Sequence, residues 1–115
     1  MLALRIFISY SPHEWLEFEN PKQKYAALVD KLREQGFDVV NPKLQLTKYD
    51  GLSRGKLNRK ITLELRGKVD LLYNYMPSYQ QRYAYVHRRV ARELGIPVYK
   101  EKKQTEKKFS IEDAV

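Results

Sequence analysis

The sequence predicts an α/β fold: a three-layer open sandwich around a mostly parallel, four-stranded sheet with about three helices. Short apolar segments typical of buried strands alternate with segments of helical periodicity, as strand–helix three times followed by a fourth strand. Turn signals, chiefly Gly and Asn-Pro, separate these segments. A chain of 115 residues supports one core but not two, so we expect a single domain over residues 1–99 and a charged tail over 100–115 that is mobile or docks on a neighbour.

The first half of the chain predicts two strands and one helix. Residues 2–8 are rich in apolar and aromatic side chains, which suits a central strand. Asn20-Pro21 supplies an N-cap and a first helical residue, and Gly36 supplies the stop. The apolar residues between them recur at helical spacing: Tyr25, Leu28, Val29 and Leu32. Residues 37–40 form the next strand, and Pro42 ends it because proline cannot donate to a central ladder.

The second half predicts two more helices and two more strands. One face of a helix over 56–66 carries Leu57, Ile61 and Leu65. Residues 69–75 form a buried strand, and a Pro-Ser loop then leads into a helix of about four turns. We expect the buried face of this helix to hold Tyr79, Tyr83, Val86, Val90 and Leu94. Residues 96–99 complete the sheet.

The expected strand order is 2-1-3-4, which places the reversal of direction between the first and third strands. Ligands of open α/β sheets bind at the carboxyl ends of the strands, at such a point. The candidate ligand-binding residues that this topology brings together are Ser9, Tyr10, Ser11, Asn41, Tyr75 and Ser78. They offer hydroxyl groups and one amide, and Ser78 also offers the anion-binding N-terminus of a helix.

Positive charge is concentrated in the middle of the chain. The net charge is +8, and residues 43–68 hold eight Lys or Arg against two Asp or Glu. Such a concentrated field attracts phosphate-bearing partners, although charge runs of this kind are more often a solvated helix face. The candidate nucleic-acid contacts are Lys43, Lys48, Arg54, Lys56, Arg59 and Lys60.

Composition excludes several classes of site. The chain has no cysteine, which rules out disulfides, thiol catalysis and thiolate metal sites and favours a cytoplasmic location. No apolar run approaches the roughly 18 residues of a membrane helix, so we expect no membrane contact. The glycine-rich signatures of nucleotide-binding loops are absent, and the two histidines, His13 and His87, do not form a helical zinc pair. We expect no metal and no cofactor.

Four segments carry a family resemblance over about residues 4–99. They are Ile6-Phe7-Ile8-Ser9, Val39-Val40-Asn41-Pro42, Asp70-Leu71-Leu72 and the ending from Ala91 to Val98. In this order and spacing they resemble the nucleoside 2-deoxyribosyltransferase-like group, small flavodoxin-like domains of phage and bacterial genomes. The first segment also resembles the opening strand of TIR domains. The resemblance implies exchange or cleavage of an N-glycosidic bond by a helix Glu that traps an oxocarbenium-like sugar.

The sequence departs from this family at the residue that performs the chemistry. The expected Glu falls on His87, and the Gly-Ala that admits the ligand falls on Tyr83-Ala84. An imidazole cannot form the glycosyl ester that a carboxylate forms, so we expect the fold and a binding cleft without the transferase chemistry. Two interpretations of His87 stay open: an inert histidine at the edge of the core face, or a residue that points into the site as a ligand contact or proton shuttle.

Three functions follow as hypotheses. The first is binding of a nucleoside or nucleotide, with His87 as the remaining catalytic candidate. The second is a basic nucleic-acid-binding protein that uses residues 43–68. The third is an oligomeric accessory protein of phage or viral type. We expect a homodimer or larger homo-oligomer in each case, because Tyr75 and Tyr85 suit a subunit interface as well as a stacked base.

Overall fold

The computed structural model describes residues 3–10, 19–75 and 82–101, without the side chains of 75, 82–84 and 101. Four strands form one sheet: β1 (Arg5–Ser9), β2 (Asp38–Val39), β3 (Leu71–Tyr75) and β4 (Val98–Glu101). Their order is β2-β1-β3-β4, and each neighbouring pair is parallel. The predicted order 2-1-3-4 is confirmed, and the described sheet is wholly parallel.

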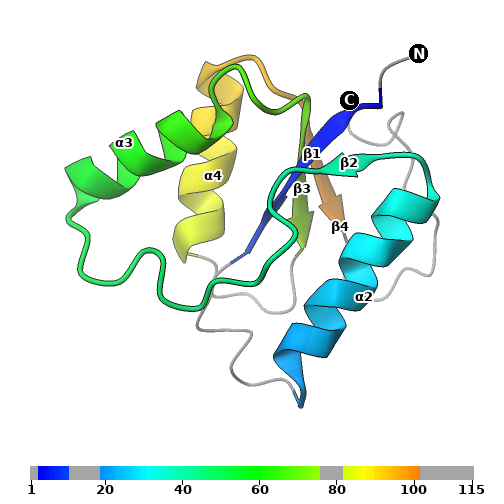
Figure 1. The fold of residues 1–115 in the computed structure, drawn as a ribbon. Coiled ribbons are helices and arrows are strands. Elements are labelled where there is room, and N and C mark those ends of the chain that lie inside the picture. Colours follow the sequence, from blue (N-terminus) through cyan, green and yellow to red (C-terminus); the bar gives the residue numbers. More distant parts are fainter. Residues whose placement is uncertain (1–2, 11–18, 76–81, 102–115) are drawn as a thin grey trace.

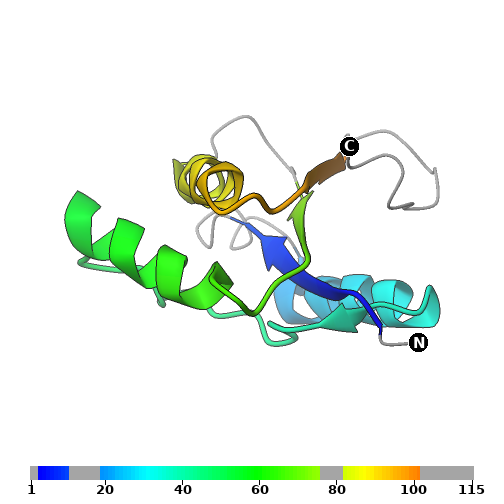
Figure 2. The same cartoon turned by 90° about the horizontal axis from the view of Figure 1, so that it is seen from above.

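In the described part of the chain, three helices cover the two faces of the sheet (Figures 1 and 2). One face carries α2 (Pro21–Glu34), and the other carries α3 (Arg54–Leu65) beside α4 (Arg82–Glu93). Right-handed crossovers require this division. The connection from β1 to β2 runs one way along the sheet, whereas the connections from β2 to β3 and from β3 to β4 run the other way. The predicted open α/β sandwich is therefore confirmed.

Side-chain alternation along the strands divides the core into two clusters. Ile6 and Ile8 of β1 pack toward α2, while Phe7 packs toward α3 and α4. The helix faces predicted for the first two helices are confirmed: Tyr25, Leu28, Val29 and Leu32 are buried in α2, and Leu57, Ile61 and Leu65 in α3.

The buried stripe of α4 differs from the predicted one. His87 and Ala91 are buried beside Val90, whereas Val86 and Leu94 are only partly buried. The prediction followed apolar residues alone and so placed the stripe off His87, which is polar yet faces the sheet. Tyr79 and the side chain of Tyr83 lie outside the described part of the chain.

Helix ends follow the predicted signals with one exception. Helix α2 begins at Pro21, and Gly36, at φ 91°, follows its end in the left-handed conformation that glycine adopts readily. The predicted cap at Asn20 is wrong, because its side chain makes no capping hydrogen bond. Its backbone is left-handed, at φ 54° and ψ 60°, whereas an N-cap needs an extended backbone to aim its side chain at the first turn. Ser53 of α3 has that conformation and accepts from the Lys56 N–H at 3.4 Å.

Strand β2 is short, and a side chain continues its pairing. Beyond Val39, the Asn41 Oδ1 accepts from the Ile8 N–H at 2.8 Å, and Asn41 Nδ2 donates to the Ile8 carbonyl at 2.8 Å. The Tyr25 hydroxyl donates to the Asn41 carbonyl at 2.7 Å and holds this residue in place. From Pro42 onward the chain leaves the edge of β1, so that edge is not covered by a further strand residue.

The opposite end of the sheet is fixed by an ion pair. Asp70 accepts from the Arg5 backbone N–H at 2.8 Å, from Nε at 3.1 Å and from Nη2 at 3.1 Å. These bonds lower the pKa of the Asp70 carboxyl and raise the pKa of Arg5. The pair holds the start of β3 beside β1, far from the carboxyl ends of the strands.

Candidate functional site

Polar side chains gather beneath α4, at the carboxyl ends of β1 and β3. Ser9 and Asn74 are partners in the register of these two strands. Together with His87 of α4 they form the buried polar set of the described residues, and each is at most 1% exposed. This edge is where the strand order predicts a site, so its geometry decides what a ligand could reach.

His87 is held from both sides of its ring. Its Nδ1 lies 3.0 Å from the Ser9 Oγ, and its Nε2 lies 2.7 Å from the Tyr49 hydroxyl. The rings of Phe7 and Tyr49 lie at centroid distances of 5.3 and 5.6 Å. The imidazole therefore links α4 to β1 and to the segment that precedes α3. This geometry favours the first interpretation of His87, a hydrogen-bonded histidine of the core.

The hydrogen bonds continue from Tyr49 toward the surface. The Tyr49 hydroxyl donates to Glu64 Oε1 at 3.0 Å, and Lys48 Nζ lies 3.4 Å from Glu64 Oε2. The Lys48 ammonium also lies 5.1, 5.1 and 4.9 Å from the ring centroids of Phe7, Tyr10 and Tyr49. Burial lowers the pKa of Lys48 and raises the pKa of Tyr49. Tyr49 is thus a neutral donor, and its partner Glu64 is the charged end of the chain.

One set of proton positions satisfies every group in this chain. Because Tyr49 donates its single proton to Glu64, His87 donates from Nε2 to the Tyr49 oxygen. Nδ1 is then the acceptor for the Ser9 hydroxyl. A serine that donates to an imidazole is the arrangement of an activated nucleophile. Ser9 is 0% exposed, however, so here the pair joins α4 to β1.

Asn74 makes a second link between the sheet and α4. Its Oδ1 accepts from Arg88 Nη1 at 2.7 Å, while its buried Nδ2 has no acceptor among the described residues. Burial, with a smaller contribution from Arg92, lowers the pKa of Arg88. The bond holds an arginine of α4 against the carboxyl end of β3.

The predicted ligand-binding residues fall into separate groups. Ser9 and His87 meet in the buried chain described above. Asn41 lies at the edge of β1 with both amide atoms engaged, and the buried Tyr10 hydroxyl accepts from the Gln45 N–H at 3.0 Å. Ser11 and Ser78 lie outside the described residues, as does the side chain of Tyr75.

An open hollow of about 390 Å³ lies beside the edge of β1 and is called the edge hollow below. Its lining residues are Phe7, Val40, Asn41, Pro42, Lys43, Gln45, Lys48, Glu64 and Lys68. It forms where the chain leaves β1 after Asn41, opposite the last turn of α3. Its volume is within the range of small-ligand sites. The structure thus brings Asn41, a predicted ligand residue, together with Lys43 and Lys48, two predicted phosphate contacts.

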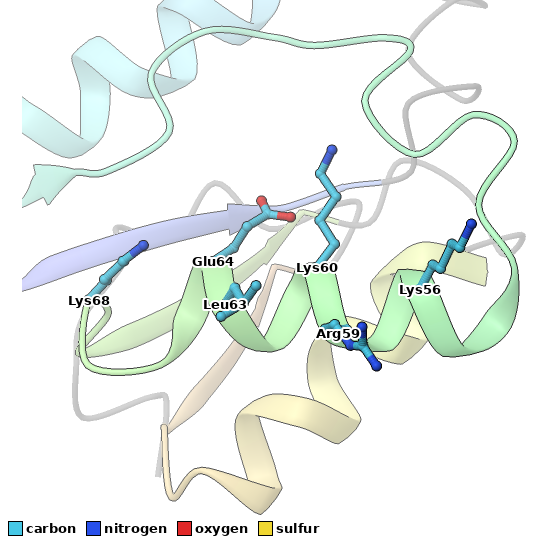
Figure 3. A pocket seen from close by; sticks show the side chains of 6 residues that line it. All are labelled: Lys56, Arg59, Lys60, Leu63, Glu64 and Lys68. Carbon is cyan, nitrogen blue, oxygen red and sulfur yellow. The ribbon is translucent and has the colours of Figure 1, made fainter.

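A second hollow, called the α3 groove below, lies on the outer side of that helix (Figure 3). It has a volume of about 330 Å³ and is lined by Lys56, Arg59, Lys60, Leu63, Glu64 and Lys68. Of the predicted nucleic-acid contacts, Lys56, Arg59 and Lys60 meet here. Arg54 is exposed at the start of α3, and the Lys48 side chain is only 8% exposed.

Sequence reasoning missed Tyr49, Glu64, Asn74 and Lys68. The signal for Glu64 was present, since it stands alone among the cations of α3. Tyr49 carried no local signal, because its partners His87 and Glu64 are 38 and 15 residues away in the chain. Its contribution depends on how the segment before α3 folds over the sheet.

Comparisons with known proteins gave no match to any family model, any curated protein or any solved structure. The family resemblance therefore stays a prediction. Within the described ranges, no three His, Asp or Glu side chains come together as metal ligands, and no helix has the length and apolar character needed to cross a membrane.

Proposed function

We propose that this protein binds a phosphate-bearing, nucleotide-type ligand in the edge hollow, without glycosyl transfer. The observation that carries the proposal is the charge of the lining. Three lysines, Lys43, Lys48 and Lys68, face one acid, Glu64. That acid is already bound to Tyr49 and Lys48, so the hollow retains an excess of positive charge from Lys43 and Lys68.

The excess charge suits an anion. Within the described ranges neither Lys43 nor Lys68 pairs with an acidic side chain, and both are exposed. The apolar part of the lining, with Val40 38% exposed and Pro42 beside it, offers surface for a base or sugar. A largely apolar hollow with a few convergent charges is the usual form of a small-ligand site.

Binding is proposed without chemistry because the carboxylate that the resemblance requires has no free counterpart at this site among the residues that the structure describes. His87 stands at that position and is buried between Ser9 and Tyr49. Glu64 borders the hollow, but its carboxylate oxygens are engaged by the Tyr49 hydroxyl and the Lys48 ammonium.

Calorimetric titration tests the proposal with a nucleoside 5′-monophosphate, its parent nucleoside and inorganic phosphate. The matched variants are K43Q/K68Q, in the edge hollow, and K31Q/R33Q, on the exposed side of α2, because each removes two positive charges. We expect the monophosphate to bind more tightly than the nucleoside. K43Q/K68Q should weaken it by at least about tenfold, equivalent to about 1.4 kcal/mol, and K31Q/R33Q should not. Absence of binding by all three compounds, or equal binding by both variants, would refute the proposal.

A further inference from the structure

The charges of α3 are arranged against the stability of the helix. Its first turn contains no acidic residue and its last turn no basic residue. Instead Arg54 and Lys56 stand near the positive end of the helix dipole, and Glu64 stands near the negative end. Lys56 and Lys60 are also like charges four residues apart, which repel each other on a helix surface. Helix stability therefore gives no reason for Arg54 and Lys56, whereas Lys60 has a contact within the fold, to the Lys48 carbonyl.

The same cations converge on the α3 groove and have no acidic partner there. Lys56, Arg59, Lys60 and Lys68 are exposed, and among the described residues none of them forms an ion pair with an acid. Lys60 donates to the Lys48 carbonyl at 2.8 Å and lies 5.8 Å from the centroid of the Tyr49 ring, and neither of these partners carries a formal negative charge. The one acid in the lining, Glu64, is bound to Tyr49 and Lys48. Figure 3 shows Lys56 and Lys60 projecting from the same side of the helix as Glu64, with Lys68 on the turn that follows the helix.

We propose that the α3 groove binds a single-stranded nucleic acid. Cations spaced along the helix axis, with Lys56 and Lys60 about 6 Å apart in rise, suit a linear polyanion. Leu63 is 61% exposed in the middle of the groove, where an unstacked base can cover it. A duplex presents phosphates at its surface and keeps its base faces stacked inside, so it offers Leu63 no such partner. An acidic protein is less well matched, because the core of a protein interface is enriched in aromatic residues and Met and depleted in Lys, whereas the lining here holds three lysines and no aromatic residue.

This surface meets the nucleotide site proposed above at Glu64 and Lys68, which line both hollows. Lys56 and Arg59 line the α3 groove and not the edge hollow. Loss of strand binding in a K56Q/R59Q variant that still binds the monophosphate would therefore locate the strand site independently. The reverse result, strand binding without monophosphate binding, would leave the present inference standing.

Fluorescence anisotropy with a labelled oligothymidylate of about 15 nucleotides tests the inference. Four phosphate contacts, from Lys56, Arg59, Lys60 and Lys68, predict an affinity loss of about 50-fold between about 50 and 200 mM salt. In K56Q/R59Q the two remaining contacts predict a loss of about sevenfold over the same range, and the three contacts left in K68Q predict about 20-fold. K31Q/R33Q removes the same charge from α2, on the opposite face of the sheet, and should keep the wild-type slope.

Several outcomes would overturn the inference. One is an affinity for the oligonucleotide that depends on salt equally in wild type, K56Q/R59Q and K68Q. A second is tighter binding of the matched duplex, which would assign the groove to double-stranded nucleic acid. A third is competition by polyglutamate at the charge concentration of the oligonucleotide, which would assign it to an acidic protein. Circular dichroism of each variant checks the fold, and K68Q lies outside the helix, so it keeps the test valid should K56Q/R59Q not fold.

Discussion

Replacing Tyr49 by Phe tests whether the buried chain from Ser9 to Glu64 holds the domain together. The substitution keeps the ring and removes one hydroxyl, which lies 2.7 Å from His87 Nε2 and 3.0 Å from Glu64 Oε1. His87 is 1% exposed, so its Nε2 proton would lose its partner out of reach of bulk water. A buried donor left without an acceptor lowers the free energy of unfolding by about 1 to 3 kcal/mol.

The loss at Glu64 is smaller because that side chain is 23% exposed and keeps Lys48. Together the two losses predict a decrease of about 2 to 4 kcal/mol in the free energy of unfolding. For a domain of this size the decrease corresponds to a fall in Tm on the order of 10 °C. Urea denaturation followed by circular dichroism measures it.

Tyr85→Phe is the matched control, since it removes a hydroxyl from a tyrosine of α4 that is 59% exposed. This control should stay within about 0.5 kcal/mol of wild type. A Tyr49→Phe protein as stable as Tyr85→Phe would refute the reasoning, because the chain would then contribute nothing to the link between α4, β1 and the segment before α3.

Three further predictions concern the same framework. Asn41→Ala should lower the free energy of unfolding by about 2 kcal/mol, because it leaves the N–H and the carbonyl of Ile8 without their hydrogen-bond partners. An unchanged melting temperature would show that the Asn41 side chain does not continue the pairing of β2. Glu64→Gln should lower the free energy of unfolding by about 2 to 3 kcal/mol, and by more than Lys48→Met does. Glu64→Gln leaves the Lys48 ammonium, which is 8% exposed, without its anion, whereas Lys48→Met leaves the Glu64 carboxylate, which is 23% exposed. Equal losses in urea melts would contradict this asymmetry. Asp70 has a pKa below its unfolded value of 3.8, so it stabilises the fold above that pH and this contribution is lost as the pH falls through the lower folded-state pKa. Asp70→Asn should therefore be less stable than wild type at pH 7. The two proteins should be equally stable at a pH low enough to protonate Asp70 in the folded and the unfolded wild-type protein, and a pH-independent difference would argue against the Arg5–Asp70 pairing.

The fold could be predicted from the sequence because its signals are local and agree with one another. Apolar spacing identified the buried faces of α2 and α3, and Gly36 and Pro42 marked where elements end. The strand order was predicted from flavodoxin-like folds, which share this succession of strands and helices, and right-handed connections are compatible with it without selecting it. The missing cap at Asn20 could not be predicted, because asparagine favours the N-cap position and also adopts the left-handed backbone that the structure shows, so residue type does not choose between the two.

The candidate site was less predictable because it depends on contacts between distant residues. Asn41 was correctly placed at the edge of the sheet, but its amide is engaged by Ile8, which no local pattern indicates. Lys48 belongs to the basic segment by sequence, yet three aromatic rings and Glu64 surround its ammonium. Lys48 is thus used within the fold, whereas Lys43 and Lys68 are exposed and have no acidic partner among the described residues.

An NMR titration of the ¹⁵N-labelled protein with a nucleoside 5′-monophosphate tests the central claim most directly. If the ligand occupies the edge hollow, the amide signals of residues 40–48 and 64–68 should shift in a saturable manner, while those of α2 stay unchanged. The absence of saturable shifts would contradict ligand binding. Shifts confined to α4 and the carboxyl end of β3 would place the ligand beneath α4 and contradict the assignment to the edge hollow.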